Sequence, residues 1–227
     1  MNGVTGIWEG EHKCWAQRLW LNRVENAMSD APSTVGNVVV PAEHDSEVNV
    51  GKWDRWYKLP HFSRRGTMYG DATTYYMAAA FLTGCAAVED WGCGAGGFQR
   101  FCPGEYIGVD GSGTPSKVAE LTTYRSDIEG ILLRHVLEHN YNWPKILEAA
   151  VKSFRKKLCL VLFTPFADTT REIAHNRGKG IDVPDLALAP SDIEAHFAGL
   201  SWKLFAGIET RSQYGVEHMY CVWRESR

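Results

Sequence analysis

Closely spaced glycines and two carboxylates are the residues best suited to chemistry in this sequence. Val88 to Phe98 reads VEDWGCGAGGF, and Asp110 follows at the end of a second apolar run, Tyr106 to Val109. Glycine lets a backbone approach a ligand at positive φ without a Cβ penalty. A helix beginning after the turn would offer free N–H groups, and a carboxylate ending the next strand would accept hydrogen bonds from ribose hydroxyls. The pattern predicts a site for a nucleoside-containing cofactor.

Two kinds of cofactor fit these glycines. Gly92, Gly94 and Gly97 satisfy G-x-G-x-x-G, the dinucleotide fingerprint, and Asp110 lies at the distance expected for its ribose-binding acid. The same segment also reads as Asp90 followed by G-x-G-x-G. A carboxylate beside the glycines would repel a pyrophosphate, but it suits a ligand that carries an amino group and a sulfonium. We therefore favour the second interpretation and keep NAD as the alternative.

In these two segments the sequence resembles the class I S-adenosylmethionine-dependent methyltransferases. Their first motif is an acidic residue followed by G-x-G-x-G, here Asp90 to Gly96, and their second is the acidic residue that ends strand two, here Asp110. The resemblance covers residues 70–223 and implies S-adenosylmethionine as cofactor and methyl transfer as reaction. An NAD-dependent oxidoreductase and a catalytically inactive relative that binds cofactor are the alternatives.

The resemblance also implies which residues bind the cofactor. They precede the first strand, form the glycine turn, follow strand two, end strand three beside the adenine, and follow strand four. In chain order they are Tyr69, Gly70, Thr73, Asp90, Trp91, Gly92, Cys93, Gly94, Asp110, Gly111, Ser112, Glu120, Leu121, Arg134 and His135.

The segment from His135 to His139, HVLEH, matches the H-x-x-E-H zinc-peptidase motif. Two histidines four apart on a helix could share a metal, with the glutamate as base. Here the motif directly follows a predicted strand, and Asn140 and Pro144 interrupt a long helix, so we predict no metal. A purely structural histidine pair is a second alternative. The resemblance implies that His135 lies near the transferable methyl and is the catalytic residue, a general base if the acceptor is a hydroxyl or protonated amine.

Apolar periodicity predicts the elements that position these residues. The expected strands are 86–90, 106–109, 118–121, 130–134, 158–163, 202–208 and 215–223. The expected helices are 71–82, a crossover helix starting at 97–101, 143–154 and 191–197. Residues 167–190 are polar and read as an irregular insertion beyond a strand end, where a lid over the acceptor site is expected.

The alternation of strands and helices predicts an α/β fold. We expect a three-layer, doubly wound, seven-stranded and mostly parallel sheet with its last strand antiparallel, plus an N-terminal extension. Residues 1–68 form that extension, packed on the core or over the active site, and residues 69–227 form the S-adenosylmethionine-binding domain. Trp53 to Phe62 mixes aromatic and basic side chains, which fits either a substrate or nucleic-acid segment or, as we favour, a surface loop anchored by its aromatics.

Composition limits the partners. A net charge of −3 gives no general attraction to nucleic acid or anionic membranes, and no apolar run approaches the roughly 20 residues that span a bilayer. Six cysteines without a C-x-x-C pair are expected to be reduced, buried thiols, and the first 14 residues lack a signal-peptide core, so we predict a cytoplasmic protein. The expected acceptor is a small polar metabolite or sugar, with nucleic acid and protein left open.

Overall fold

The computed structural model of the chain describes residues 49–60, 62, 64 and 66–225. The first 48 residues of the predicted N-terminal extension, including Cys14, lie outside the described residues.

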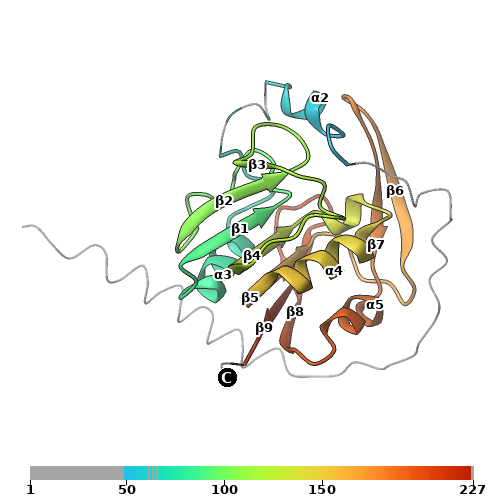
Figure 1. The fold of residues 1–227 in the computed structure, drawn as a ribbon. Helices are drawn as coiled ribbons and strands as arrows, with labels where there is room; N and C mark the ends of the chain where they lie inside the picture. The colour runs from blue at the N-terminus through green and yellow to red at the C-terminus, as the bar shows by residue number, and fades with distance from the viewer. Residues whose placement is uncertain (1–48, 61, 63, 65, 226–227) are drawn as a thin grey trace, which may run out of the picture. The chain divides into compact units, whose positions relative to one another are not determined.

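A mixed sheet forms the centre of the described part, where it has seven strands in the order β3-β2-β1-β4-β5-β9-β8 (Figure 1). The first five in chain order pair in parallel, and β9 is antiparallel to both of its neighbours. This arrangement confirms the predicted sheet with its antiparallel last strand. The strands are β1 (Ala87–Trp91), β2 (Glu105–Asp110), β3 (Lys117–Val118), β4 (Ile128–Arg134), β5 (Phe154–Leu162), β8 (Ser201–Glu209) and β9 (Val216–Trp223).

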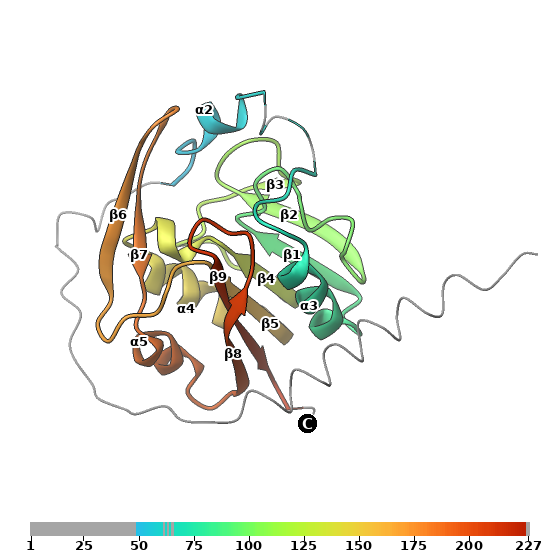
Figure 2. The ribbon, with the colours of Figure 1, turned by 180° about the vertical axis from the view of Figure 1, so that it is seen from behind.

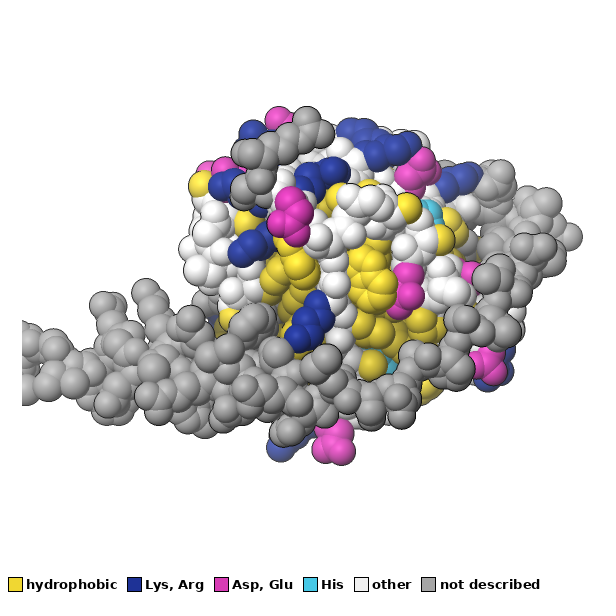
Figure 3. Space-filling view, turned by 90° about the horizontal axis from the view of Figure 1, so that it is seen from below, with side chains coloured by type: hydrophobic (Ala, Val, Ile, Leu, Met, Phe, Trp, Pro, Cys, Tyr) yellow, Lys and Arg dark blue, Asp and Glu magenta, His cyan; other side chains and the backbone are white. Residues whose placement is uncertain are grey.

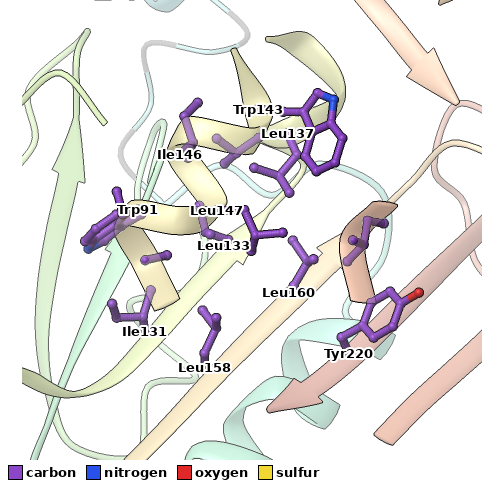
Figure 4. Packing of buried hydrophobic residues seen from close by; sticks show 14 of the residues in the cluster. Trp91, Ile131, Leu133, Leu137, Trp143, Ile146, Leu147, Leu158, Leu160 and Tyr220 are labelled. Carbon is purple, nitrogen blue, oxygen red and sulfur yellow. The ribbon is translucent and has the colours of Figure 1, made fainter. Parts of the chain in front are cut away.

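Helices cover both faces of the sheet. Helix α4 (Trp143–Ser153) lies in front of it in Figure 1, and α3 (Thr73–Leu82) lies in front of it in the reverse view of Figure 2. Because side chains alternate along a strand, Leu133 and Leu160 face α4, whereas Leu132 and Cys159 face the side of α3. All four are fully buried. Figure 4 shows the α4 side of this core, which extends from Trp91 to Tyr220. The three layers are those predicted.

The connection from β1 to β2 contains no helix, so the predicted crossover helix at 97–101 is wrong. Residues 94–101 form consecutive turns instead. Gly94 and Gly96 have φ of 53° and 76°, which lie outside the helical region, and Pro103 ends the segment. A Cβ on Gly97 would lie 2.7 Å from the carbonyl oxygen of Thr67. Position 97 therefore has no room for a side chain beside Thr67.

The predicted irregular insertion is in fact a β-hairpin, separate from the main sheet. Strands β6 (Arg171–Gly178) and β7 (Ile181–Ala187) pair antiparallel. Lys179 and Gly180 at the tip both have positive φ, as a type I′ turn requires. Pro184 concealed the strand in the sequence, but a two-stranded ribbon has unpaired edges that tolerate proline. A Cβ on Gly180 would lie 2.3 Å from that of Arg55, so the hairpin tip packs on α2 (Asp54–Tyr57), as both ribbon views show.

Shorter elements complete the described chain: η2 (Leu137–His139), α5 (Pro190–Glu194) and η3 (Ala195–Phe197). Cys85, Cys93, Cys159 and Cys221 are buried free thiols. On the face drawn in Figure 3, the coloured lysines and arginines are dispersed among acidic and hydrophobic side chains. None of the helices in the described part is both long and apolar enough to cross a membrane.

Candidate active site

A cavity of about 600 Å³ lies beyond the carboxyl ends of the central strands. Ligands of doubly wound folds bind at this edge of the sheet. Most of the residues predicted to bind cofactor line it, although they come from five separate segments of the chain. They are Tyr69, Gly70, Asp90, Gly92, Cys93, Gly94, Asp110, Gly111, Leu121, Arg134 and His135.

Four other residues predicted to bind cofactor do not line this cavity. Trp91 points into the core on the α4 side and donates its indole N–H to Glu89. Ser112 accepts the Trp53 N–H, and the Glu120 carboxylate accepts the N–H of Asn49 at 2.7 Å, so both hold the segment before α2. Thr73 begins α3. Ser112 and Glu120 therefore act on the backbone that covers the site.

Two glycines of the turn after β1 have geometric reasons to be glycine. Gly92 has a φ of 73°, and a Cβ there would lie 2.4 Å from Cγ2 of Val136. Gly94 has a φ of 53°, and its Cβ would lie 3.0 Å from the Tyr57 hydroxyl. The N–H of Gly94 donates to Oδ2 of Asp110 at 2.9 Å. The two predicted motifs are thus joined by a direct hydrogen bond.

Asp90 and Asp110 bring two nearly buried carboxyl groups to the cavity, with 4% and 7% of their surface exposed. Burial raises the pKa of Asp90 to about 7; the charge of Asp110 adds to the rise, and a hydrogen bond from Tyr106 opposes it. Burial likewise raises the pKa of Asp110 to about 6, against hydrogen bonds from the N–H groups of Gly94 and Ser112. A cationic ligand between them would stabilise their ionised forms.

Arg134, at the end of β4, fixes the segment that precedes α3. Its guanidinium is buried, lies 2.9 Å from Oε1 of Glu217, and donates to the carbonyl oxygen of Tyr69 at 2.9 Å. It also lies 4.1 Å from the ring centroid of Tyr75 and donates to the Thr74 hydroxyl. Because its donors are used within the protein, Arg134 shapes the cavity wall and positions Tyr69.

His135 lies in the cavity wall in a strained backbone conformation, with φ of 58°. Its Nδ1 lies 3.4 Å from a guanidinium nitrogen of Arg134, and its Nε2 lies 3.2 Å from Oε1 of Glu217, off the direction of an aligned hydrogen bond. Burial first, and then the charge of Arg134, lower the pKa of His135 to about 4. The imidazole is neutral at pH 7.

The rest of the HVLEH segment does not have the geometry of a zinc motif. Residues 137–139 form a short 3₁₀ helix instead of the α-helix that would align two histidines. Glu138 is buried; it accepts the Phe163 N–H at 2.6 Å, and burial raises its pKa to about 7. Within the described residues no group of three or more His, Cys, Asp or Glu side chains is arranged to hold a metal ion.

His139 faces the cavity and is held by the hairpin. Its Nδ1 lies 3.0 Å from the carbonyl oxygen of Pro184 and 3.2 Å from Oδ1 of Asp185, and its ring packs near Trp53 and Phe163. The sequence reasoning missed Asp185, because nothing local links a hairpin residue to a histidine 46 positions earlier.

The segment around α2 also lines the cavity, through Asn49, Trp53, Trp56 and Tyr57. Its backbone is tied to the loop after β2, since Gly51 N–H donates to the Gly111 carbonyl at 2.7 Å. The aromatic content of this segment was the only signal for it in the sequence. A further wall is formed by residues 211–213, in the connection between β8 and β9.

One of three comparisons with known proteins found similar proteins, among solved structures. No family model and no curated protein matches the sequence. The structure is similar to a 1,6-didemethyltoxoflavin-N1-methyltransferase from Burkholderia thailandensis, with TM-score 0.51 and 10% identity over 100% of this chain and 94% of that one. That protein was crystallised with bound 1,6-didemethyltoxoflavin and S-adenosylhomocysteine. A magnesium protoporphyrin IX methyltransferase from Synechocystis PCC 6803 with bound S-adenosylmethionine gives TM-score 0.49 and 16% identity, over 78% and 93% of the two chains. Strand order, the antiparallel last strand and the first of these similarities together show that the chain has the fold of the class I methyltransferases.

Proposed function

We propose that this chain is an S-adenosylmethionine-dependent methyltransferase acting on a small polar acceptor, a metabolite or a sugar. The observation that carries the proposal is the direct joining of the glycine turn to Asp110, beside Asp90, in a cavity at the carboxyl edge of a methyltransferase-type sheet.

The carboxylates suit the two polar parts of this cofactor. Asp110 accepts one backbone N–H on each oxygen, and a carboxylate has about four acceptor positions, so lone pairs remain for ribose hydroxyls. Asp90 lies one residue before Trp91 at the end of β1 and supplies negative charge for a ligand with a sulfonium and an ammonium group. The open backbone at Gly92 and Gly94 would let the cofactor approach closely.

The same geometry argues against NAD. A pyrophosphate site depends on free N–H groups and the positive end of a helix after the glycine turn. The described chain has successive turns there, and the two carboxyl groups would repel a phosphate. The dinucleotide alternative therefore loses its main physical support.

We assign the acceptor to the part of the cavity beyond β5. β2 and β5 are separated by β1 and β4 in the sheet, so their ends lie roughly 14 Å apart. Walls here come from α2, the β6–β7 hairpin and residues 211–213, and they combine the aromatic rings of Trp53 and Phe163 with the amides of Asn176 and Gln213. Ring faces with a few polar groups suit a small polar ligand. The similar Burkholderia protein also has a small-molecule acceptor.

Residues 69–227 would form the cofactor-binding domain of a cytoplasmic enzyme, with the described part of the preceding extension, around α2, over its site. His135 remains our sequence-based candidate for a catalytic residue. Its contacts with Arg134 and Glu217 hold the imidazole in the cavity wall, where it would lie beside the transferable methyl.

Thermal melts test the proposal, with S-adenosylmethionine, S-adenosylhomocysteine and NAD in parallel. A ligand at about 100 times its dissociation constant adds about 2.7 kcal/mol, or roughly 5–10 °C for a chain of this size. We expect both adenosyl ligands to raise Tm and NAD to leave it unchanged. A rise with NAD alone would make the chain an oxidoreductase candidate. Binding without S-adenosylhomocysteine release across an acceptor panel would favour an inactive relative.

A further inference from the structure

Asp185 is a carboxylate with several polar contacts behind the acceptor side of the cavity. It is fully buried in β7, yet four side chains from other segments contact it. Asn176 donates to Oδ1 at 2.8 Å, Gln213 and Tyr214 donate to Oδ2 at 3.0 and 2.8 Å, and His139 Nδ1 lies 3.2 Å from Oδ1. Burial opposes ionisation, but these contacts together hold the pKa of Asp185 below its ordinary value. A buried anion thus lies directly behind His139.

The contacts of His139 determine which of its ring nitrogens carries hydrogen. Nδ1 faces the carbonyl oxygen of Pro184 at 3.0 Å as well as the Asp185 carboxylate, and both groups can only accept. Nδ1 must therefore be protonated, and in the neutral ring Nε2 keeps its lone pair. Nε2 has no hydrogen-bond partner among the residues that the structure describes, and His139 lines the cavity.

His135 does not offer a nitrogen in the same way. The guanidinium beside its Nδ1 can only donate, so Nδ1 keeps its lone pair and Nε2 carries the hydrogen; Nε2 lies 3.2 Å from Oε1 of Glu217 without an aligned hydrogen bond. Both nitrogens face groups of the protein. Of the two histidines in the HVLEH segment, His139 is the one whose ring nitrogen with a lone pair meets no group among the described residues, so that lone pair can accept from a ligand.

We propose that His139 is the proton acceptor of the reaction and that Asp185, supplied by the inserted hairpin, is its positioning residue, so that the acceptor is methylated on a hydroxyl. This inference rests on the proposed function. The acceptor oxygen attacks the methyl carbon of S-adenosylmethionine, the C–S bond breaks with its electron pair going to sulfur, and S-adenosylhomocysteine leaves. The hydroxyl proton moves to Nε2 of His139, and the resulting imidazolium is stabilised by Asp185.

The chemistry of the acceptor explains why this arrangement favours a hydroxyl. Only a small fraction of an aliphatic amine is neutral near pH 7, but that fraction has already lost its extra proton to solvent and attacks through its own lone pair, so it needs no base during the transfer itself. An alcohol does not ionise appreciably there, and a base positioned within the site typically contributes 10²–10⁴-fold. A buried carboxylate behind an imidazole whose other ring nitrogen is open to the ligand is the arrangement that serves this need.

The first test is the nitrogen NMR spectrum of the full chain, labelled with ¹⁵N-histidine and saturated with S-adenosylhomocysteine. We expect His139 as the neutral Nδ1–H tautomer, and a mixture of tautomers in Asp185→Asn. Asp182→Asn, on the same strand but exposed and paired with His175, is the matched control and should not change the His139 signals. If His139 of the native chain is instead the neutral tautomer with its hydrogen on Nε2, the proposal is overturned, even where cofactor binding is normal.

The second test measures reactivity at Nε2 with diethyl pyrocarbonate, mapped by mass spectrometry. We expect His139 to be modified at least tenfold faster than His135.

Catechol and 1,2-phenylenediamine then serve as matched hydroxyl and amine probes in an S-adenosylhomocysteine release assay. We expect His139→Asn to lower transfer to catechol by 100-fold or more while leaving the cofactor-induced rise in Tm unchanged. Faster labelling of His135, or unchanged transfer to catechol in His139→Asn, would overturn the inference. If S-adenosylhomocysteine does not raise the Tm of the native chain, the proposed function itself is refuted.

Discussion

Replacing Asp90 by asparagine should stabilise the ligand-free chain at neutral and alkaline pH. Asp90 is 4% exposed, and burial raises its pKa from 3.8 to about 7. The folded state therefore holds a proton on Asp90 at pH values where the unfolded state has lost it. The stability that this proton provides declines as pH rises from about 4 to about 7. Asparagine resembles the protonated acid and can still accept the Tyr106 hydrogen bond, so the variant keeps this stability as pH rises.

The size of the effect follows from the pKa. Each unit is worth about 1.36 kcal/mol, and the interval from pH 5 to the folded pKa spans about two units. The advantage of Asp90→Asn over the native chain should thus grow by about 2–3 kcal/mol between pH 5 and pH 8, or roughly 5–10 °C in Tm. At the same time, the variant should bind S-adenosylhomocysteine more weakly, because it lacks the charge that faces the amino group.

Urea unfolding at pH 5 and pH 8, without ligand, is the appropriate assay. Asp127→Asn provides the matched control, since its side chain is 80% exposed and should show almost no pH-dependent difference. A stability difference for Asp90→Asn that is the same at both pH values, or a variant less stable than the native chain at pH 8, would refute the account of this buried carboxylate.

Two further substitutions test the cofactor site. Asp110→Ala should weaken S-adenosylhomocysteine binding by roughly 1.5–3 kcal/mol through loss of a charged acceptor, measured by titration calorimetry, and unchanged affinity would remove Asp110 from the ribose site. Gly94→Val should abolish binding while the circular dichroism spectrum remains that of the folded chain, because its φ is 53° and a Cβ would lie 3.0 Å from the Tyr57 hydroxyl. Normal binding by this variant would show that the glycine turn does not hold the cofactor.

The sequence was informative where the signal is contiguous. The glycine turn and Asp110 could be predicted because each belongs to a short strand–turn pattern. The core strand was predicted as 158–163 because that run is continuously apolar, whereas its first residues, Phe154 and the basic residues 155–157, were not predicted to be part of it. Pro144 marked the start of α4, because proline fits the first turn of a helix. Local preference and final structure agree at these places, so the α/β fold and its antiparallel last strand could be predicted from the sequence.

The errors arose where tertiary contacts decide the backbone. The helix expected to start at 97–101 did not take into account the positive φ of Gly94 and Gly96, and the connection from β1 to β2 consists of turns. Pro184 and a polar composition concealed the hairpin, whose strands are stabilised by pairing with each other and by the contacts of Asp185. The link between His139 and Asp185 is non-local, so no spacing rule could have predicted it.

A crystal structure of the full chain with S-adenosylhomocysteine tests the central claim most directly. The account predicts the adenosyl group beyond the ends of β1 and β2, with ribose hydroxyls within hydrogen-bonding distance of Asp110 and the homocysteine backbone beside Gly92. The sulfur should point toward His135 and His139. A ligand bound elsewhere, or a cavity that remains empty at saturating ligand, would contradict the account.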